Sequence, residues 1–228
     1  MKERSRTTRF LAEGLVIVVS ILIAFALDAS WDARNERIEA GELRSGLVED
    51  FSETGVELQR VRRRKEEVMV AADSVLAALS QASTPFLVSS AHLGALLLTP
   101  TTDPQMGTLQ ALISSARLRI VGDEELQGLL SEWPARLSDT REEELAAKTF
   151  VHEQLTPALS EVVDLSGAFA WRLDGGTNET EVEVRLTPTD LVEFRNLIRT
   201  RQYLAGFVLT NYLDLERALE QIDAALTS

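Results

Sequence analysis

An apolar stretch near the N-terminus constrains this chain more than any other feature. The stretch from Phe10 to Leu27 contains one charged side chain, Glu13. As a helix that rises about 1.5 Å per residue, it would extend roughly 27 Å, close to the hydrocarbon thickness of a bilayer. We therefore predict a transmembrane helix over residues 10–27. The anchoring residues that we predict are Phe10, Glu13, Leu15, Ile21, Leu27 and, at the far interface where an indole is favoured, Trp31.

The charges on the two sides of this stretch differ in sign. Residues 1–9 hold four basic side chains against one acid, Glu3, whereas the whole chain has 23 Lys and Arg against 36 Asp and Glu. By the positive-inside rule, residues 1–9 form a cytoplasmic tail and residues 28–228 lie across the membrane. We expect the inner (cytoplasmic) membrane of a bacterium, with a periplasmic domain over residues 28–228.

Two alternatives remain open at this end of the chain. The stretch Leu15–Leu27 also fits the apolar core of a cleavable signal peptide, with Ala24-Phe25-Ala26 as a weak cleavage pattern. Glu13 is either a functional ionisable residue within the span or a partner of Arg9, which lies four residues earlier, at headgroup depth.

Composition excludes several classes of protein. A net charge of -13 argues against a general nucleic-acid binder, which needs a basic surface to neutralise phosphates. The absence of cysteine excludes disulfides, thiolate metal sites and a cysteine nucleophile.

Helical periodicity governs the rest of the chain. Between residues 47 and 79, ten positions follow a strict 4-3 spacing and eight of them are apolar, which predicts a long helix packed along one seam. Gly41 and Gly46 favour a kink before the seam. The ten positions are Leu47, Phe51, Thr54, Leu58, Val61, Lys65, Val68, Ala72, Val75 and Leu79.

A second long helix is predicted at the C-terminus, starting at Thr187-Pro188 and running to the end of the chain. We expect it to pack against the first helix, with a central helix from Asp123 to Val163, interrupted at Trp133-Pro134 and near Pro157, completing a bundle. The predicted stripe of the last helix is Leu197, Arg201, Leu204, Val208, Asn211, Leu215, Ala218, Ile222 and Leu226.

The predicted fold class is therefore all-α. One N-terminal transmembrane helix continues into an extended periplasmic helical bundle, with at most a short strand near residues 181–186, where apolar and charged residues alternate. Shorter helices are expected over Ser90–Leu98 and Gly107–Leu118, and Asp174-Gly175-Gly176-Thr177-Asn178 forms the strongest predicted loop.

Several short motifs are spread over most of the chain: Glu13-Gly14, Ile21-Leu22-Ile23-Ala24, Trp31, Leu109 to Ile120, Asp123-Glu124-Glu125-Leu126, Leu197-Ile198-Arg199 and Asn211-Tyr212-Leu213. In this layout the chain resembles a bacterial family of single-pass membrane proteins with a helical outer domain, known only as a domain of unknown function. The family usually has asparagines beside the tryptophan, where this chain has Ser30 and Asp32. The resemblance implies a membrane-anchored helical domain and no particular reaction.

Catalytic motifs are poorly represented. The two histidines are His92 and His152, and His152-Glu153 begins like the zinc-protease motif H-E-x-x-H, but Thr156 stands where the second ligand is required. We predict no catalytic residue, no cofactor and no metal site. Aromatic side chains at helical spacing are expected in the core or at an interface; these are Trp133, Phe169, Trp171, Phe194, Tyr203, Phe207 and Tyr212.

One dense basic cluster stands out in the acidic chain. It contains Arg60, Arg62, Arg63 and Arg64, followed by Lys65. The cluster is either a solvated helix face that pairs with acids of the chain itself, such as those of Glu142–Glu144, or a docking site for an acidic protein partner.

Together these features predict a non-enzymatic, membrane-anchored accessory or scaffold subunit. Its partners would be the lipid bilayer and other membrane protein subunits of a larger complex, such as an energy-converting respiratory or photosynthetic assembly. The alternatives are a periplasmic sensor or ligand-binding module coupled to an inner-membrane partner, and a tethered hydrolase that uses carboxylates. Heptads do not distinguish an internal seam from a dimer, so a homo-oligomer also stays open.

Overall fold

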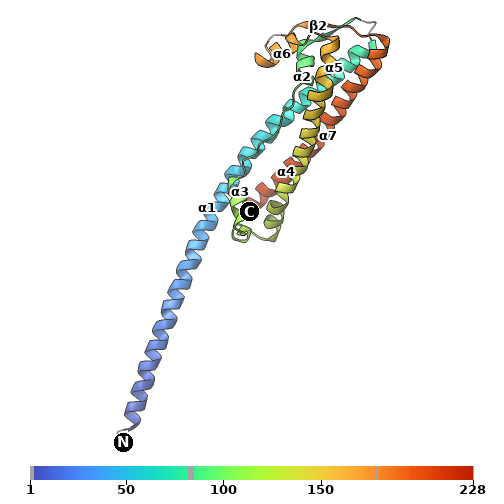
Figure 1. The fold of residues 1–228 in the computed structure, drawn as a ribbon. Helices are drawn as coiled ribbons and strands as arrows, with labels where there is room; N and C mark the ends of the chain where they lie inside the picture. Colours follow the sequence, from blue (N-terminus) through green and yellow to red (C-terminus); the bar gives the residue numbers. More distant parts are fainter. Residues whose placement is uncertain (1–2, 82–84, 178, 228) are drawn as a thin grey trace.

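The computed structural model describes residues 3–81, 85–177 and 179–227, with side chains from residue 18 onward except those of residues 188 and 189. The described chain is mostly helical (Figure 1). In chain order the elements are α1 (Glu3–Gln81), β1 (Phe86–Ser89), α2 (Ser90–Leu96), α3 (Gly107–Ser114), a 3₁₀ turn (Leu118–Ile120), α4 (Glu124–Phe150), a π turn (Val151–Leu155), α5 (Thr156–Val162), α6 (Ser166–Leu173), β2 (Glu181–Val184) and α7 (Pro188–Thr227).

Helix α1 is one continuous helix of 79 residues, which corresponds to a length of about 118 Å. It passes through Gly41 and Gly46 without a break in its helical assignment. Its N-terminal half projects away from the other elements, whereas its C-terminal half packs into the bundle (Figure 1). We call residues 18–38 the stem.

The predicted seam of α1 is confirmed at every position. All ten residues between Leu47 and Leu79 are buried, including Thr54 and Lys65, at 1% and 6% exposure. This face packs mainly against α7, which in turn packs against α4, so the bundle is built from α1, α4 and α7. Two long helices from opposite ends of the chain therefore share one core, as predicted.

The predicted stripe of α7 is only partly right. Arg201, Val208 and Leu215 are buried, but Asn211 is half-buried and its neighbour Tyr212 is fully buried. Six of the nine predicted positions are buried, and at each of the other three the next residue along the chain is the buried one. The buried residues of α7 are Phe194, Ile198, Arg201, Ala205, Val208, Tyr212, Leu215, Ala218, Leu219, Ile222 and Leu226.

The predicted interruption at Trp133-Pro134 is wrong, because α4 continues through Pro134. Trp133 is fully buried and meets Phe51 of α1 edge to face, with ring centroids 5.3 Å apart. Proline has no backbone N–H, so the helix lacks one hydrogen bond at Pro134. The packing of the neighbouring Trp133 against α1 stabilises the helix at this point. The interruption near Pro157 is confirmed: a π turn ends at Leu155, and the Thr156 hydroxyl donates to the Val151 carbonyl at 2.7 Å.

A two-stranded antiparallel sheet covers one end of the bundle. Phe86 of β1 pairs with Val184 of β2, and Ser89 pairs with Glu181. The strand predicted near residues 181–186 is confirmed over Glu181–Val184, whereas β1 and α6 were not predicted.

The core consists of two apolar clusters along the bundle. One joins the sheet, α2, α5 and α6 to the adjacent ends of α1 and α7. The other joins α3 and the first part of α4 to residues 47–61 of α1 and to the C-terminal half of α7. Buried charged residues lie between the two clusters along α1, α4 and α7. They are described below together with the pocket that lies beside them.

Among the helices as described, none has a stretch both long and apolar enough to cross a bilayer. Residues 10–17 of the predicted span, with Phe10, Glu13 and Leu15, lie outside the described side chains. The predicted span therefore stays a prediction. The other predicted anchoring residues, Ile21, Leu27 and Trp31, are exposed on the stem.

Candidate functional site

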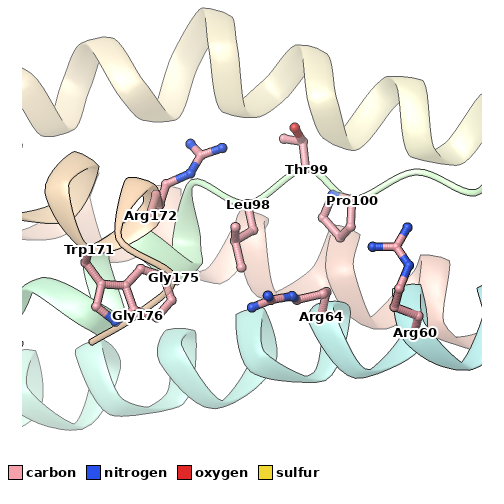
Figure 2. Close-up of a pocket in the computed structure, with 9 residues that line it drawn as sticks. All are labelled: Arg60, Arg64, Leu98, Thr99, Pro100, Trp171, Arg172, Gly175 and Gly176. Carbon is pink, nitrogen blue, oxygen red and sulfur yellow. The ribbon is translucent and has the colours of Figure 1, made fainter. Parts of the chain in front are cut away.

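A pocket of about 270 Å³ opens between α1, the segment that follows α2, and the end of α6 (Figure 2). Its lining contains three arginines, one tryptophan and a pair of glycines. The lining residues are Arg60, Arg64, Leu98, Thr99, Pro100, Trp171, Arg172, Gly175 and Gly176. We call it the arginine pocket.

Two of the arginines come from successive turns of α1. Because Val61 and Lys65 occupy the buried seam, their neighbours Arg60 and Arg64 fall on the outer face of the helix. Arg64 lies along α1 in the direction of Trp171, and Arg60 rises toward Pro100 (Figure 2). Each pairs with an acid three residues away on the same helix, Arg60 with Glu57 at 2.7 Å and Arg64 with Glu67 at 2.9 Å.

The third arginine and the tryptophan are neighbours at the end of α6. Arg172 donates to the Leu97 carbonyl at 3.2 Å. Trp171 packs so closely on α2 that a Cβ on Gly94 would lie 2.4 Å from its ring. The turn that follows places Gly175 and Gly176 at φ values of +74° and +86°, which glycine adopts without strain. The predicted loop therefore forms one wall of the pocket.

The pocket is electropositive in an acidic protein. None of its nine lining residues, all in the described part of the chain, is an Asp or Glu. The exposed ion pairs of Arg60 and Arg64 with their neighbours are of the kind that contributes little to stability. Arginine presents a planar fork of donors that matches carboxylate and phosphate groups, so this arrangement suits an anion.

Beneath the pocket, α1, α4 and α7 contribute the buried charged layer, which we define as Lys65, Glu144, Arg201 and Tyr212. Lys65 Nζ lies 3.2 Å from the Glu144 carboxylate and 5.1 Å from the centre of the Tyr212 ring. The Tyr212 hydroxyl donates to the same carboxylate. Burial lowers the pKa of Lys65, and Glu144 opposes part of this shift. Burial, followed by the charge of Glu144, raises the pKa of Tyr212 far above its usual range.

The buried charges bind the backbone between α2 and α3. Arg201 donates to the carbonyls of Leu96 and Leu98, at 2.9 and 2.6 Å, and burial lowers its pKa to about 10. Lys65 donates to the Pro100 carbonyl at 2.7 Å, and Glu144 accepts from the Thr102 amide at 3.3 Å. Charged side chains thus satisfy backbone groups that would otherwise be buried without partners.

The buried charged layer is closely packed and leaves almost no space for a ligand. Glu144 is 4% exposed, and the cavity beside Lys65 and Arg201 measures about 10 Å³, enough for roughly one water molecule. A carboxylate beside a cation, such as Glu144 beside Lys65, is a pairing that acid–base catalysis uses. Here, however, the Glu144 carboxylate is buried and not accessible to a substrate. The prediction that the protein is not an enzyme stays a prediction.

The structure separates the four predicted docking arginines. Arg60 and Arg64 line the arginine pocket, Arg62 pairs with Glu216 of α7 at 2.9 Å and with Glu66 at 2.5 Å, and Arg63 borders a second hollow. Arg60, Arg62 and Arg64 thus pair with acids of α1 and α7: Glu57, Glu66, Glu67 and Glu216. From the acidic run Glu142–Glu144, Glu144 forms an ion pair with Lys65.

The second hollow is an open groove of about 460 Å³ on the other side of Trp171. It is mainly apolar, and its rim carries Arg63, Glu66, Glu67 and His92. The other histidine, His152, is exposed on the π turn. The described side chains include no group of three or more His, Asp or Glu that could hold a metal ion.

Sequence reasoning missed the α6 half of the arginine pocket. Trp171 and Arg172 reach the pocket through the packing of α6 on α2, which leaves no local pattern in the sequence. The buried charged layer did leave a signal, since Lys65 and Arg201 are the charged residues in two stripes that are mostly apolar.

No known protein family, curated protein or solved structure matches this chain. The resemblance to the family of single-pass membrane proteins accordingly stays a prediction.

Proposed function

We propose that this protein is a non-enzymatic accessory or scaffold subunit anchored in the bacterial inner membrane. Residues 10–27 lie in the bilayer beside helices of other subunits. The bundle docks on a larger complex, of which a respiratory or photosynthetic assembly is one example. The observation that carries the proposal is the apolar surface of the stem, which no other described part of the chain covers.

The stem carries nine large apolar side chains, each at least 44% exposed. Consecutive residues such as Ile21, Leu22 and Ile23 point in directions about 100° apart, so the apolar surface surrounds the helix over residues 18–27. A helix that is apolar on all sides is normally buried in a membrane or within a large protein. The nine residues are Val18, Val19, Ile21, Leu22, Ile23, Phe25, Leu27, Trp31 and Ile38.

The length of α1 supports a role in which it holds the bundle away from the membrane, where a partner protein can contact it. Between Leu27 and Leu47, the first residue of the buried seam, α1 extends for about 30 Å. This length would hold the bundle away from the headgroups, where a partner could contact it. Exposed apolar residues on α7, including the stacked pair Tyr203 and Phe207, offer one surface for such a contact.

The experiment is a gentle-detergent purification of the tagged full-length protein from its native membrane, with mass spectrometry of stoichiometric partners. We expect a reproducible membrane complex. A matched variant, Tyr203→Asp with Phe207→Asp, should remain in the membrane and lose the partner. A monodisperse protein without partners would contradict the proposal.

A second candidate function is a ligand-binding module coupled to an inner-membrane partner. The arginine pocket favours it, because a concave surface lined by arginines beside a half-buried aromatic ring is typical of a binding site. The absence of any ligand-induced shift in melting temperature across a panel of small organic anions would count against it.

A further inference from the structure

We infer that the arginine pocket binds a small organic anion, with its carboxylate or phosphate group between Arg60 and Arg64 and a planar or apolar body against Trp171. This inference goes beyond the proposed scaffold function, and only the argument for a soluble ligand rests on the membrane anchoring that this function includes.

The charge of the pocket is the first argument. Three arginines line one hollow of a chain whose net charge is -13, and no acid lines it among the described residues. The neighbouring acids occupy only part of the two guanidinium groups on α1. Glu57 accepts from Nε and Nη2 of Arg60, and Glu67 accepts from Nη1 of Arg64. Among the described residues, Nη1 of Arg60 and Nε and Nη2 of Arg64 have no hydrogen-bond acceptor.

The position of Trp171 is the second argument. The indole lines both the arginine pocket and the neighbouring groove, whose wall includes Val70, Ala71, Ala91 and Ala95. The two hollows therefore meet at one half-buried aromatic ring, with three arginines on one side and, on the other, an aliphatic wall whose rim carries charged side chains of both signs. A ligand that fits both sides carries a charged group at one end and an apolar or aromatic group at the other.

The place of the pocket along α1 argues for a soluble ligand. Arg60 lies roughly 50 Å beyond Leu27 at about 1.5 Å per residue, and α1 is continuous between them. With the stem in a bilayer, lipid headgroups would not reach the arginines. The volume of about 270 Å³ is at the small end of ligand sites, which matches a compact anion better than a peptide.

The test uses the full chain labelled with 5-fluorotryptophan, reconstituted in nanodiscs. The chain has three tryptophans, so ¹⁹F NMR gives three signals, which single Trp→Phe variants assign. With phenyl phosphate as the probe, we expect a saturable shift of the Trp171 signal, while the signals of Trp31 on the stem and Trp133 in the core stay in place.

Two further probes divide the ligand into its parts. Inorganic phosphate carries the charge alone and benzyl alcohol carries the ring alone, so each should bind at least tenfold more weakly than phenyl phosphate. Equal binding of inorganic phosphate would overturn the role of Trp171, and equal binding of benzyl alcohol would overturn the role of the arginines.

The matched variants separate a specific site from general attraction to positive charge. Arg60→Gln with Arg64→Gln should weaken the binding of phenyl phosphate at least tenfold. Arg217→Gln is the control, because Arg217 is likewise exposed and pairs with an acid three residues away, Asp214. It should leave the affinity within twofold. Equal loss in both variants, or no shift of the Trp171 signal, would overturn the proposal.

Discussion

At the scale of single residues, the buried charged layer is the least expected feature of the core. Lys65, Glu144 and Arg201 are each at most 6% exposed, and they lie between two apolar clusters. A buried ion pair often adds little net stability because desolvation offsets the attraction, but removal of one partner leaves an uncompensated charge. The hydrogen bonds to the Leu96–Thr102 backbone indicate that the layer fixes how this segment sits between α1 and α4.

The Lys65–Glu144 pair gives a prediction about coupling. Lys65→Met and Glu144→Leu should each lower the free energy of unfolding by about 3 kcal/mol, because each leaves one buried charge without its partner. The double variant should lose at least 1 kcal/mol less than the sum of the single losses, measured by urea unfolding of the full chain in mild detergent. The exposed Arg136–Glu132 pair, changed in the same way, serves as the control and should show coupling of about 0.5 kcal/mol or less. Additive losses at Lys65 and Glu144 would contradict this reading.

Tyr212 gives a prediction about pH. Its pKa is raised above the ordinary value of 10.0, so the folded protein keeps the phenol proton at a pH where the unfolded chain loses it. The stabilisation is complete below pH 10 and is lost as the pH rises above that value. Tyr212→Phe should cost about 2 kcal/mol at pH 7, through the lost hydrogen bond to Glu144.

The stability difference between wild type and Tyr212→Phe should be constant from pH 7 to 9 and should shrink by about 1.4 kcal/mol per pH unit above 10. Urea unfolding at each pH measures it. The other tyrosine, Tyr203, is exposed, so Tyr203→Phe is the control for changes that follow from the loss of any phenol. A difference that stays constant up to pH 11 would rule out a raised pKa at Tyr212.

At the scale of elements, the long helices were predictable because each repeats one pattern over many turns. The α1 seam was correct at all ten positions, whereas three of the nine positions of the α7 stripe were displaced by one residue. Helix α7 packs against both α1 and α4, so its buried face is wider than a single stripe. Leu197 and Ile198 both contact the core, and a pattern of apolar residues alone does not show which of the two is central.

The short elements were predictable only where a local pattern marks them. Alternation marks Glu181–Val184, but Phe86–Ser89 has four residues and no alternation of charge, so only its pairing with β2 defines it. For the same reason, only half of the arginine pocket could be predicted from the sequence. Arg60 and Arg64 form a local cluster that the sequence displays, whereas Trp171 and Arg172 join them through tertiary packing.

The α1 seam gives a prediction about the bundle. Leu58 is fully buried in the cluster that joins α1, α4 and α7, so Leu58→Ala should lower the free energy of unfolding by about 3 kcal/mol. Val56 lies two residues earlier on the same helix and is 68% exposed, so Val56→Ala should change it by less than about 0.5 kcal/mol. Equal effects of the two substitutions in urea unfolding would show that the seam is misplaced.

At the scale of the whole molecule, the long helix separates two parts with different surfaces. The bundle buries most of its large apolar side chains within the chain, whereas the stem, which projects from the bundle (Figure 1), exposes nine of them. The central claim is that a bilayer and neighbouring membrane helices cover the apolar part of the stem, residues 18–27. Because the chain has no cysteine, single cysteine substitutions report on individual positions without background labelling.

The most direct measurement is therefore the reaction of a membrane-impermeant maleimide with Leu22→Cys and Val56→Cys, each in the full chain in native membrane vesicles opened to the reagent on both sides. The two side chains are similarly exposed in the structure, at 61% and 68%, so the protein itself does not favour either position. We predict rapid labelling of Val56→Cys and at least tenfold slower labelling of Leu22→Cys, with the difference abolished by a denaturing detergent. Equal labelling of the two variants in intact membranes would contradict the anchoring of the stem.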